Sequence, residues 1–465
     1  MPSQMSPEEF RAAAHKAVDW MADFLRDVRD YPVLAQVKPG DLIDRLPSSG
    51  PEQGEPIERI LEDFSNLIVP GVTHWNHPRF FAYFANSASG PGILGEMLAA
   101  VLNVNHMVWK TGPSATELEQ VTLSWMRQWL GLPDGFFGII HDTASTGGMH
   151  AIMAAREAAA PQIRLHGEHP SLVLYLSEHA NFAVDRAALA VGVGRNNLRH
   201  IPIDGEFRMR PDALRAAIEK DLAAGRKPFC VVPTLGTTSS SSVDPLPEIG
   251  KITREYSLWL HVDAAYAGPA ALLDEHRHIL DGAELADSIT VNPHKWLFTP
   301  VDLSILYTRR PEMMRAALSL EETPAYIVTA ENQRAVNFSE YSVPLGRRFR
   351  ALKLWFVLRY YGRDGIVEIL RNHIRFAHRF AQKVGEDPRF EVSAPVLFSL
   401  VCFRYRGSDD ENRSLLERVN ATGEAFLSGT VLKGSFVLRL AIGNVGTTEE
   451  DVLDTWELIQ SLTSV

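Results

Sequence analysis

The chain has 465 residues, which is enough for two or three packed units rather than one small core. Its 45% hydrophobic and 22% charged residues are typical of a globular protein, and its formal net charge of −11 argues against nucleic acid as a partner, because duplex binding needs a basic face. No stretch reaches the ~18 apolar residues that span a bilayer, and the first residues lack a signal-peptide core. Two cysteines in apolar runs, Cys230 and Cys402, predict neither a disulfide framework nor a metal site. We therefore expect a cytoplasmic protein without a membrane partner.

A long helix is predicted near the N-terminus. Ser6 can cap it, Pro7 fits its first turn, and Glu9 lies three residues after the cap, as a capping box requires. Apolar residues then recur at steps of three and four, which places one apolar stripe along the helix. The stripe contains Phe10, Ala14, Ala17, Met21, Phe24 and Val28. It must cover either its own domain or a partner subunit, and we assign residues 1–85 to an N-terminal helical segment.

From about residue 90, short apolar runs alternate with helical stretches. The runs lie at 138–141, 172–176, 229–233, 258–262, 288–292 and 303–308. Helices are predicted between them at 148–159, 211–224 and 246–256. Apolar strands separated by helices indicate an α/β fold with a mainly parallel sheet covered on both faces, in which ligands bind at the carboxyl ends of the strands. Beyond it a helix, alternating strands and a last helix predict a small α+β unit, so we place domains at 86–365 and 366–465.

Lys295 directly follows one of the apolar runs and precedes Trp296. Burial beside aromatic side chains disfavours the charged ammonium, which lowers the pKa of a lysine and makes its amine nucleophilic. A desolvated lysine is the usual means of holding an aldehyde cofactor as a Schiff base. On the lysine alone, a side chain that extends its ammonium to solvent at the strand end is the commoner arrangement.

Asp263 ends the preceding apolar run, 32 residues before Lys295. In adjacent parallel strands this spacing would bring both side chains to one edge of the sheet. A carboxylate there can keep a pyridine nitrogen protonated, and the protonated ring then accepts electrons from a carbanion. The small residues Ala264 and Ala265 leave space for a flat ring. An N-cap for the next helix is the alternative role for Asp263.

A phosphate-binding turn is predicted where the run at 138–141 leads into a helix through Thr143, Ala144 and Ser145. Hydroxyls and free N–H groups at a helix N-terminus bind phosphate. A plain capped turn would have the same pattern. Thr237 ends another run and offers a hydroxyl, and Asn292 and His294 flank Lys295, where they could reach the phosphate or orient the lysine. Together with Lys295 and Asp263 they predict a site for pyridoxal 5′-phosphate (PLP).

At these residues the chain resembles the group II PLP-dependent amino-acid decarboxylases, and in particular the aromatic-L-amino-acid (DOPA, tyrosine or tryptophan) decarboxylases. The matching segments include GVTHWNHPRFFAYF, TELEQVTLSWM, TLGTT, LWLHVDAAYAG, ADSITVNPHKWL and VPLGRRFRALKLWFVLR, and the resemblance covers nearly the whole chain. It implies the PLP-dependent transferase fold of type I, with a seven-stranded sheet. It also implies a homodimer with shared active sites, in which the N-terminal segment packs on the partner.

The resemblance also implies roles for individual residues. Lys295 would carry PLP, Asp263 would pair with the pyridinium nitrogen, and Ala265 would pack on the ring. The other residues around the cofactor would be Thr143, Ala144, Ser145, Thr237, Asn292 and His294. Tyr326 corresponds to the loop tyrosine that returns a proton to Cα after CO2 leaves, by way of an external aldimine and a quinonoid. The pocket for the aromatic side chain would contain Trp75, Tyr83 and Phe84, although ordinary core aromatics are the alternative.

Two departures from the family pattern bear on the outcome. Asn181 stands where the family has a histidine that stacks on the cofactor, and His179 lies two residues earlier. Changes at that histidine or at the loop tyrosine are associated with aldehyde synthases, which release an aldehyde, ammonia and peroxide, so this reaction is the alternative to amine formation. Asn105 and His106 are polar at a pocket wall that is mostly apolar in the family, which predicts a hydroxylated or otherwise polar substrate.

Two further interpretations concern the function of the whole chain and the role of two arginines. A non-catalytic scaffold with the same fold is disfavoured because Lys295, Asp263 and Tyr326 occur together. Arg347 and Arg348 are interpreted as members of structural ion pairs.

Overall fold

A seven-stranded sheet forms the centre of the computed structural model, which describes residues 4–167, 171–320, 330–331 and 334–463. Its order is β1-β7-β6-β5-β4-β2-β3, and all neighbours are parallel except where β7 pairs antiparallel with β1 and β6. The strands are β1 (Phe137–His141), β2 (Leu172–Ser177), β3 (Leu198–Ile201), β4 (Lys227–Val232), β5 (Trp259–Asp263), β6 (Ser288–Val291) and β7 (Ser304–Thr308). The mainly parallel seven-stranded sheet is therefore confirmed.

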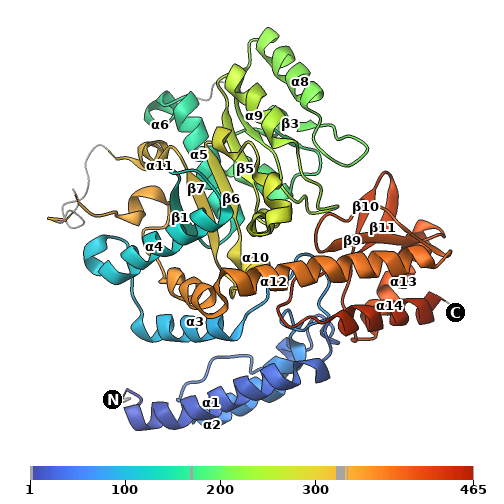
Figure 1. The fold of residues 1–465 in the computed structure, drawn as a ribbon. Helices are drawn as coiled ribbons and strands as arrows, with labels where there is room; N and C mark the ends of the chain where they lie inside the picture. Colours follow the sequence, from blue (N-terminus) through green and yellow to red (C-terminus); the bar gives the residue numbers. More distant parts are fainter. Residues whose placement is uncertain (1–3, 168–170, 321–329, 332–333, 464–465) are drawn as a thin grey trace.

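Helices cover both faces of this sheet (Figure 1). One apolar cluster joins the sheet to α5 (Ala144–Ala159), α7 (Phe182–Ala190) and α11 (Pro311–Leu318). The other joins it to α4 (Pro113–Leu130), α8 (Pro211–Ala223) and α9 (Leu246–Glu255). Successive residues of one strand belong to opposite clusters, as Leu174 and Tyr175 do, which is why the strands are apolar throughout.

A small unit packs against the second half of α12 (Arg350–Glu386). The helical path of α12 is interrupted at Gly362, which has a φ of 62°. The four antiparallel strands of the unit have the order β10-β11-β9-β8. They are β8 (Phe390–Val392), β9 (Leu400–Tyr405), β10 (Ser428–Leu432) and β11 (Ser435–Ala441). With α13 (Asp409–Ala421) and α14 (Glu449–Thr463) they enclose an apolar cluster of their own. The predicted α+β character of this unit is confirmed.

The N-terminal helices lie outside the sheet layers (Figure 1). The capping box of Ser6 and Glu9 opens α1 (Pro7–Asp27) as predicted, and α2 (Ile57–Asp63) lies beside it. Then α3 (Gly90–Leu102) packs on α12. The remaining helices are the short α6 (Gln162–His166) and α10 (Pro293–Trp296). None of the helices in the described ranges has the length and apolarity that crossing a bilayer requires.

Candidate active site

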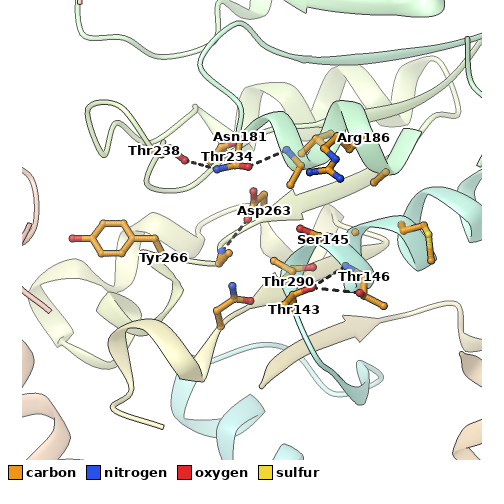
Figure 2. Close-up of a pocket in the computed structure, with 18 of the residues that line it drawn as sticks. Thr143, Ser145, Thr146, Asn181, Arg186, Thr234, Thr238, Asp263, Tyr266 and Thr290 are labelled. Atoms are coloured by element: carbon orange, nitrogen blue, oxygen red, sulfur yellow. Dashed lines mark hydrogen bonds between the residues drawn. The ribbon is translucent and has the colours of Figure 1, made fainter. Parts of the chain in front are cut away.

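A cavity of about 630 Å³ lies at the carboxyl ends of β4, β5 and β6, between the first turns of α5 and α7. The predicted site residues that line it are Phe84, Thr143, Ala144, Ser145, Asp263, Ala265, Asn292, His294 and Lys295. Figure 2 shows how side chains from β5, α5 and the start of α7 converge on this space. The cavity lining as a whole comes from six segments of the chain, as expected for the carboxyl edge of a parallel sheet.

Lys295 lies on the short helix α10, which follows β6 directly. Burial lowers the pKa of its ammonium, and the nearby carboxylate of Asp263 opposes that shift only in part. Its Nζ lies 5.6 Å from the centre of the Phe84 ring, and that ring stacks on Tyr266 with centroids 3.7 Å apart. No hydrogen bond to Nζ is found among the described residues. The amine is thus desolvated by aromatic walls and open to the cavity, which makes it a nucleophile.

Asp263 ends β5, and its strand partner on β6 is Thr290. Its Oδ1 accepts a hydrogen bond from the backbone N–H of Ala265 at 3.0 Å (Figure 2), while Oδ2 has no partner in the described ranges. The N–H of Ala265 therefore fixes the carboxylate and leaves one oxygen for a cationic group in the cavity. The neighbouring strands β5 and β6 are parallel, and Asp263 and Lys295 line the same cavity at their carboxyl ends.

The turn after β1 presents hydrogen-bond donors to the cavity. Thr143 is the N-cap of α5, and its hydroxyl accepts from the N–H of Thr146 at 3.4 Å (Figure 2). The first N–H groups of a helix have no partner within it, so those of Ala144 and Ser145 remain as donors beside the Ser145 hydroxyl. A helix N-terminus with two free N–H groups and a hydroxyl is suited to a phosphate.

Asn292 and His294 are fixed by hydrogen bonds on the side that faces the protein. Asn292 Oδ1 accepts from the Ser304 hydroxyl at 2.6 Å, and His294 Nδ1 accepts from the N–H of Leu303 at 2.9 Å. Burial lowers the pKa of His294 to about 3, and the charge of Lys295 adds to this effect. The imidazole is therefore neutral, and its proton is on Nε2.

Three predicted site residues do not line the cavity. The hydroxyl of Thr237 is buried in its own loop, where it bonds to Ser240 at 3.1 Å and Ser242 at 2.9 Å, so this prediction is corrected. Trp75 and Tyr83 stack on each other with centroids 5.8 Å apart and remain 38% and 53% exposed. Of the three predicted pocket aromatics only Phe84 reaches the cavity within one chain. Tyr326 lies outside the described residues.

Sequence reasoning missed Thr238 and His261, which line the cavity. Two consecutive threonines gave no signal for which of them points inward, and the loop turns Thr238 rather than Thr237 toward the site. His261 could have been found, because residues two apart on a strand share a face and it precedes Asp263 by two.

Asn181 lines the cavity at the N-cap of α7. Its Oδ1 accepts from the N–H of Ala183 and its Nδ2 donates to the Thr238 hydroxyl, both at 2.9 Å. His179 stacks instead on Phe207, with centroids 5.6 Å apart, and is not among the cavity-lining residues. Among the described residues, no histidine therefore replaces Asn181 on this wall.

The prediction that His106 makes a wall of the substrate pocket polar is wrong. His106 is fully buried, and its Nε2 lies 3.2 Å from Glu119, which also pairs with Arg347 at 2.7 Å. This buried network is hydrogen-bonded to the backbone of Ile140 on β1, and it uses Nε2 of His106 for the protein interior. Arg348 pairs with Glu96, so both arginines belong to ion pairs as predicted.

Comparison with known proteins identifies this architecture. The family model for the pyridoxal-dependent decarboxylase conserved domain matches residues 39–406. The chain belongs to the pyridoxal-dependent decarboxylase family. "Tyrosine decarboxylase 2" of Narcissus pseudonarcissus is 42% identical over 99% of this chain and 95% of its own length, and "Phenylacetaldehyde synthase" of Arabidopsis thaliana is 41% identical over 98% and 95%. A crystal structure of Oryza sativa TDC with PLP and tryptamine superposes with a TM-score of 0.96, at 36% identity, over 100% of this chain and 99% of that one.

The cavity of this decarboxylase fits PLP, the cofactor of its family. It offers a desolvated amine, a carboxylate with one free oxygen, and a helix N-terminus with free donors. These groups match the aldehyde, the ring nitrogen and the phosphate of PLP. The volume of about 630 Å³ leaves additional space for a substrate side chain.

Proposed function

We propose that this enzyme removes CO2 from an aromatic L-amino acid and releases the corresponding aryl amine. The observation that carries the proposal is the position of Lys295 beside the Phe84 ring in the cavity that also contains Asp263. An aromatic substrate can pack on that wall. The relatives named as tyrosine decarboxylase and TDC support the choice of substrate class.

In this proposal the residues divide the work of holding the cofactor. Lys295 would bind it covalently, Asp263 Oδ2 would pair with its ring nitrogen, and Ala265 would support one face of the ring. Its phosphate would be held by Thr143, Ala144 and Ser145, with Asn292 and His294 beside it. PLP supplies an electron-accepting ring for the electron pair that the departing CO2 leaves behind.

Proton transfer is assigned to residues near the reacting carbon. Tyr326 is proposed to return a proton to the substrate Cα, and a positioned proton donor is typically worth ~10²–10⁴ in rate. His294 is neutral with its proton on Nε2, so it can donate a hydrogen bond without adding positive charge beside Lys295. Trp75 and Tyr83 are proposed to close the aromatic pocket after a second subunit covers them.

A second candidate function is supported by Asn181. In the aldehyde synthase reaction one amino acid, one O2 and one water give an aldehyde, CO2, ammonia and hydrogen peroxide. The amide of Asn181 is held by the Ala183 N–H and the Thr238 hydroxyl, and within the described ranges no imidazole takes its place on this wall. "Phenylacetaldehyde synthase" is among the relatives at 41% identity.

The two reactions are separated by a product assay. The enzyme with PLP is incubated with L-DOPA, L-tyrosine, L-tryptophan or L-phenylalanine, and CO2, amine, aldehyde and hydrogen peroxide are measured. Equal amounts of CO2 and amine support the decarboxylase. Peroxide in proportion to CO2, with little amine, assigns the aldehyde synthase reaction, and no CO2 from any of these substrates contradicts both.

A homodimer is proposed from the outer surface of α3. Gly92 and Gly95 face α12 so closely that a Cβ on Gly95 would lie 2.6 Å from the Cα of Lys353. This leaves the large apolar side chains of the helix exposed, namely Leu94, Leu98, Val101 and Leu102. Exposed apolar patches of this kind mark protein interfaces, and a second copy of the chain is the proposed partner.

The cytoplasm is the proposed location. Cys230 and Cys402 are free and buried in β4 and β9, and their separate strands give no disulfide between them. Free thiols without disulfides suit a reducing compartment.

A further inference from the structure

A second cavity, of about 430 Å³, lies at the opposite edge of the large sheet, where β5 and β6 begin. Because β7 runs antiparallel to β6, the end of β7 reaches this same edge, and Arg309 and Arg310 follow it directly. The last turns of α5 and α9 complete the walls. β5 begins at this cavity with Trp259 and ends at the candidate active site with Asp263, so the two cavities lie at opposite ends of one strand.

Three guanidinium groups and one carboxylate line this second cavity, namely those of Arg254, Arg309, Arg310 and Asp287. Burial raises the pKa of Asp287, and the charges of all three arginines act against that shift, so the three groups surround the same carboxylate. Within the described ranges, however, no ion pair joins Asp287 to any of them. The lining therefore has a formal charge of +2, in a chain whose net charge is −11.

The three guanidiniums have few partners within the protein. Arg254 has no side-chain hydrogen bond or ion pair in the part of the chain that the structure describes, and Arg309 donates to a backbone carbonyl. Arg310 lies over the ring of Trp259, with Cζ 5.2 Å from the ring centre, and its Nε is 3.5 Å from Glu312. A guanidinium has five N–H donors, so most of these donors remain for a ligand.

The lining indicates which ligand would fit. Guanidinium groups match the oxygens of a phosphate in both charge and geometry, and a phosphate dianion would offset the charge of +2. Phe229, Leu258 and Leu285 provide apolar walls for an organic group attached to that phosphate. Asp287 Oδ2 accepts from the N–H of Leu260 at 2.9 Å, which leaves Oδ1 for a hydroxyl or amine of the ligand.

We propose that this cavity is a second ligand site, which binds a phosphate monoester between the guanidiniums of Arg254, Arg309 and Arg310. The organic group of the ester packs on the apolar walls and donates a hydrogen bond to Asp287. A monocarboxylate would offset only half of the positive charge, which is why phosphate is the assigned head group. The site is independent of the reaction proposed for the other edge of the sheet.

The first test is calorimetric titration of the holoenzyme, after borohydride has fixed its PLP and dialysis has removed the free cofactor. The probes are inorganic phosphate, phenyl phosphate and ribose 5-phosphate at constant ionic strength. One site per chain is expected, and both esters should bind more tightly than inorganic phosphate because their organic groups contact the walls. If neither ester shows saturable binding, the site is overturned, and equal affinity for all three probes overturns the assignment of an ester.

The second test locates the binding with Arg254→Gln, which removes one charge and breaks no side-chain contact in the described ranges. A hydrogen bond between charged groups is worth on the order of 10-fold in affinity, so the dissociation constant of phenyl phosphate should rise by about that factor. Arg195→Gln is the matched control, since Arg195 is also exposed but does not line the cavity. Equal losses in both variants would indicate attraction by surface charge alone and would overturn the site.

The third test has the opposite sign. In Asp287→Asn the amide oxygen can keep the hydrogen bond from the Leu260 N–H, while the negative charge beside the guanidiniums is removed. Inorganic phosphate should therefore bind more tightly than it does to the wild type, a gain that damage to the fold would not produce. Weaker binding would overturn the inference that Asp287 and the arginines face one ligand. If this variant does not fold, Arg254→Gln decides the proposal, and none of these measurements requires CO2 release.

Discussion

The carboxyl edge of the large sheet and the surface made by the N-terminal helices differ in how much of their apolar surface one chain can bury. All six residues of β2 are buried, and the site residues at this edge rest on packed strands. By contrast, α1 has 21 residues and buries only Ala13, and α3 buries only Gly92 and Gly95. The first region is buried within one chain, while the second leaves apolar side chains exposed, and the proposed homodimer would cover them.

The residues of the candidate site are divided between these two regions. Lys295, Asp263 and the phosphate-binding turn are positioned by strands that are buried on both sides, so their geometry depends on the core of one chain. Trp75 and Tyr83 are exposed in that chain, so their proposed part in the aromatic pocket would depend on the proposed second subunit. The expected experiments separate these two dependences.

The largest effect is expected for Lys295→Ala, which removes the nucleophile of the buried edge. The rate of CO2 release should fall on the order of 10⁴-fold or more, because removal of the nucleophile removes the covalent reaction pathway in which the other site residues act. The rate is measured by CO2 release at saturating PLP. Lys220→Ala, on the exposed side of α8, is the matched control and should behave as the wild type. Substantial CO2 release by the Lys295→Ala protein would contradict the assignment.

The next effect is expected for Asp263→Asn. The asparagine oxygen can still accept from the N–H of Ala265, so the local fold is kept, but the counter-charge for the ring nitrogen is lost. Removing one partner of a buried ion pair costs about 3–5 kcal/mol, so PLP should bind roughly 10²–10⁴-fold more weakly. Equilibrium titration of the apoenzyme measures this. Asp274→Asn, whose side chain is 86% exposed, is the control, and equal losses in both variants would contradict the role of Asp263.

The same contrast explains which features could be predicted from sequence. Strands buried on both faces give uninterrupted apolar runs, so β1, β2, β4, β5, β6 and β7 were predicted, whereas the short edge strand β3, with Arg199 and His200, was not. The start of α5 was placed late because Gly147 and Gly148 disguise its first turn. Side-chain direction within a loop has no periodicity, which is why Thr237 was chosen over Thr238. His106 was misjudged because it lies in a loop and its partner Glu119 is 13 residues away on α4.

A smaller effect is expected where the second region meets its partner. Val101 on α3 is 72% exposed in one chain, and burial of such a side chain is worth about 1.5 kcal/mol. A twofold-symmetric interface contains it twice, so Val101→Ser should weaken a homodimer about 10²-fold. Analytical ultracentrifugation over a concentration series measures the dissociation constant. Val431→Ser, at an exposed valine of β10, is the control, and a wild type that remains monomeric would contradict the proposed dimer.

The smallest effect concerns the acid stability of the buried edge. His373 on α12 accepts a hydrogen bond from the Trp296 indole at 3.0 Å, and burial lowers its pKa to about 4 from an ordinary value of 6.5. Between these two pKa values the unfolded chain binds a proton that the folded chain excludes, so stability falls as the pH is lowered from 7 to 5. The contribution of this one group over that interval is about 2 kcal/mol.

His373→Gln should reduce the difference in unfolding free energy between pH 7 and pH 5 by that amount. Urea unfolding monitored by circular dichroism gives the unfolding free energy at each pH. Because the two pH values are compared within each protein, any loss of stability from repacking that does not depend on pH cancels. His15→Gln, at an exposed histidine of α1, is the matched control variant. If both variants keep the wild-type pH dependence, the buried edge does not exclude the proton at His373, and its acid stability is set by other groups.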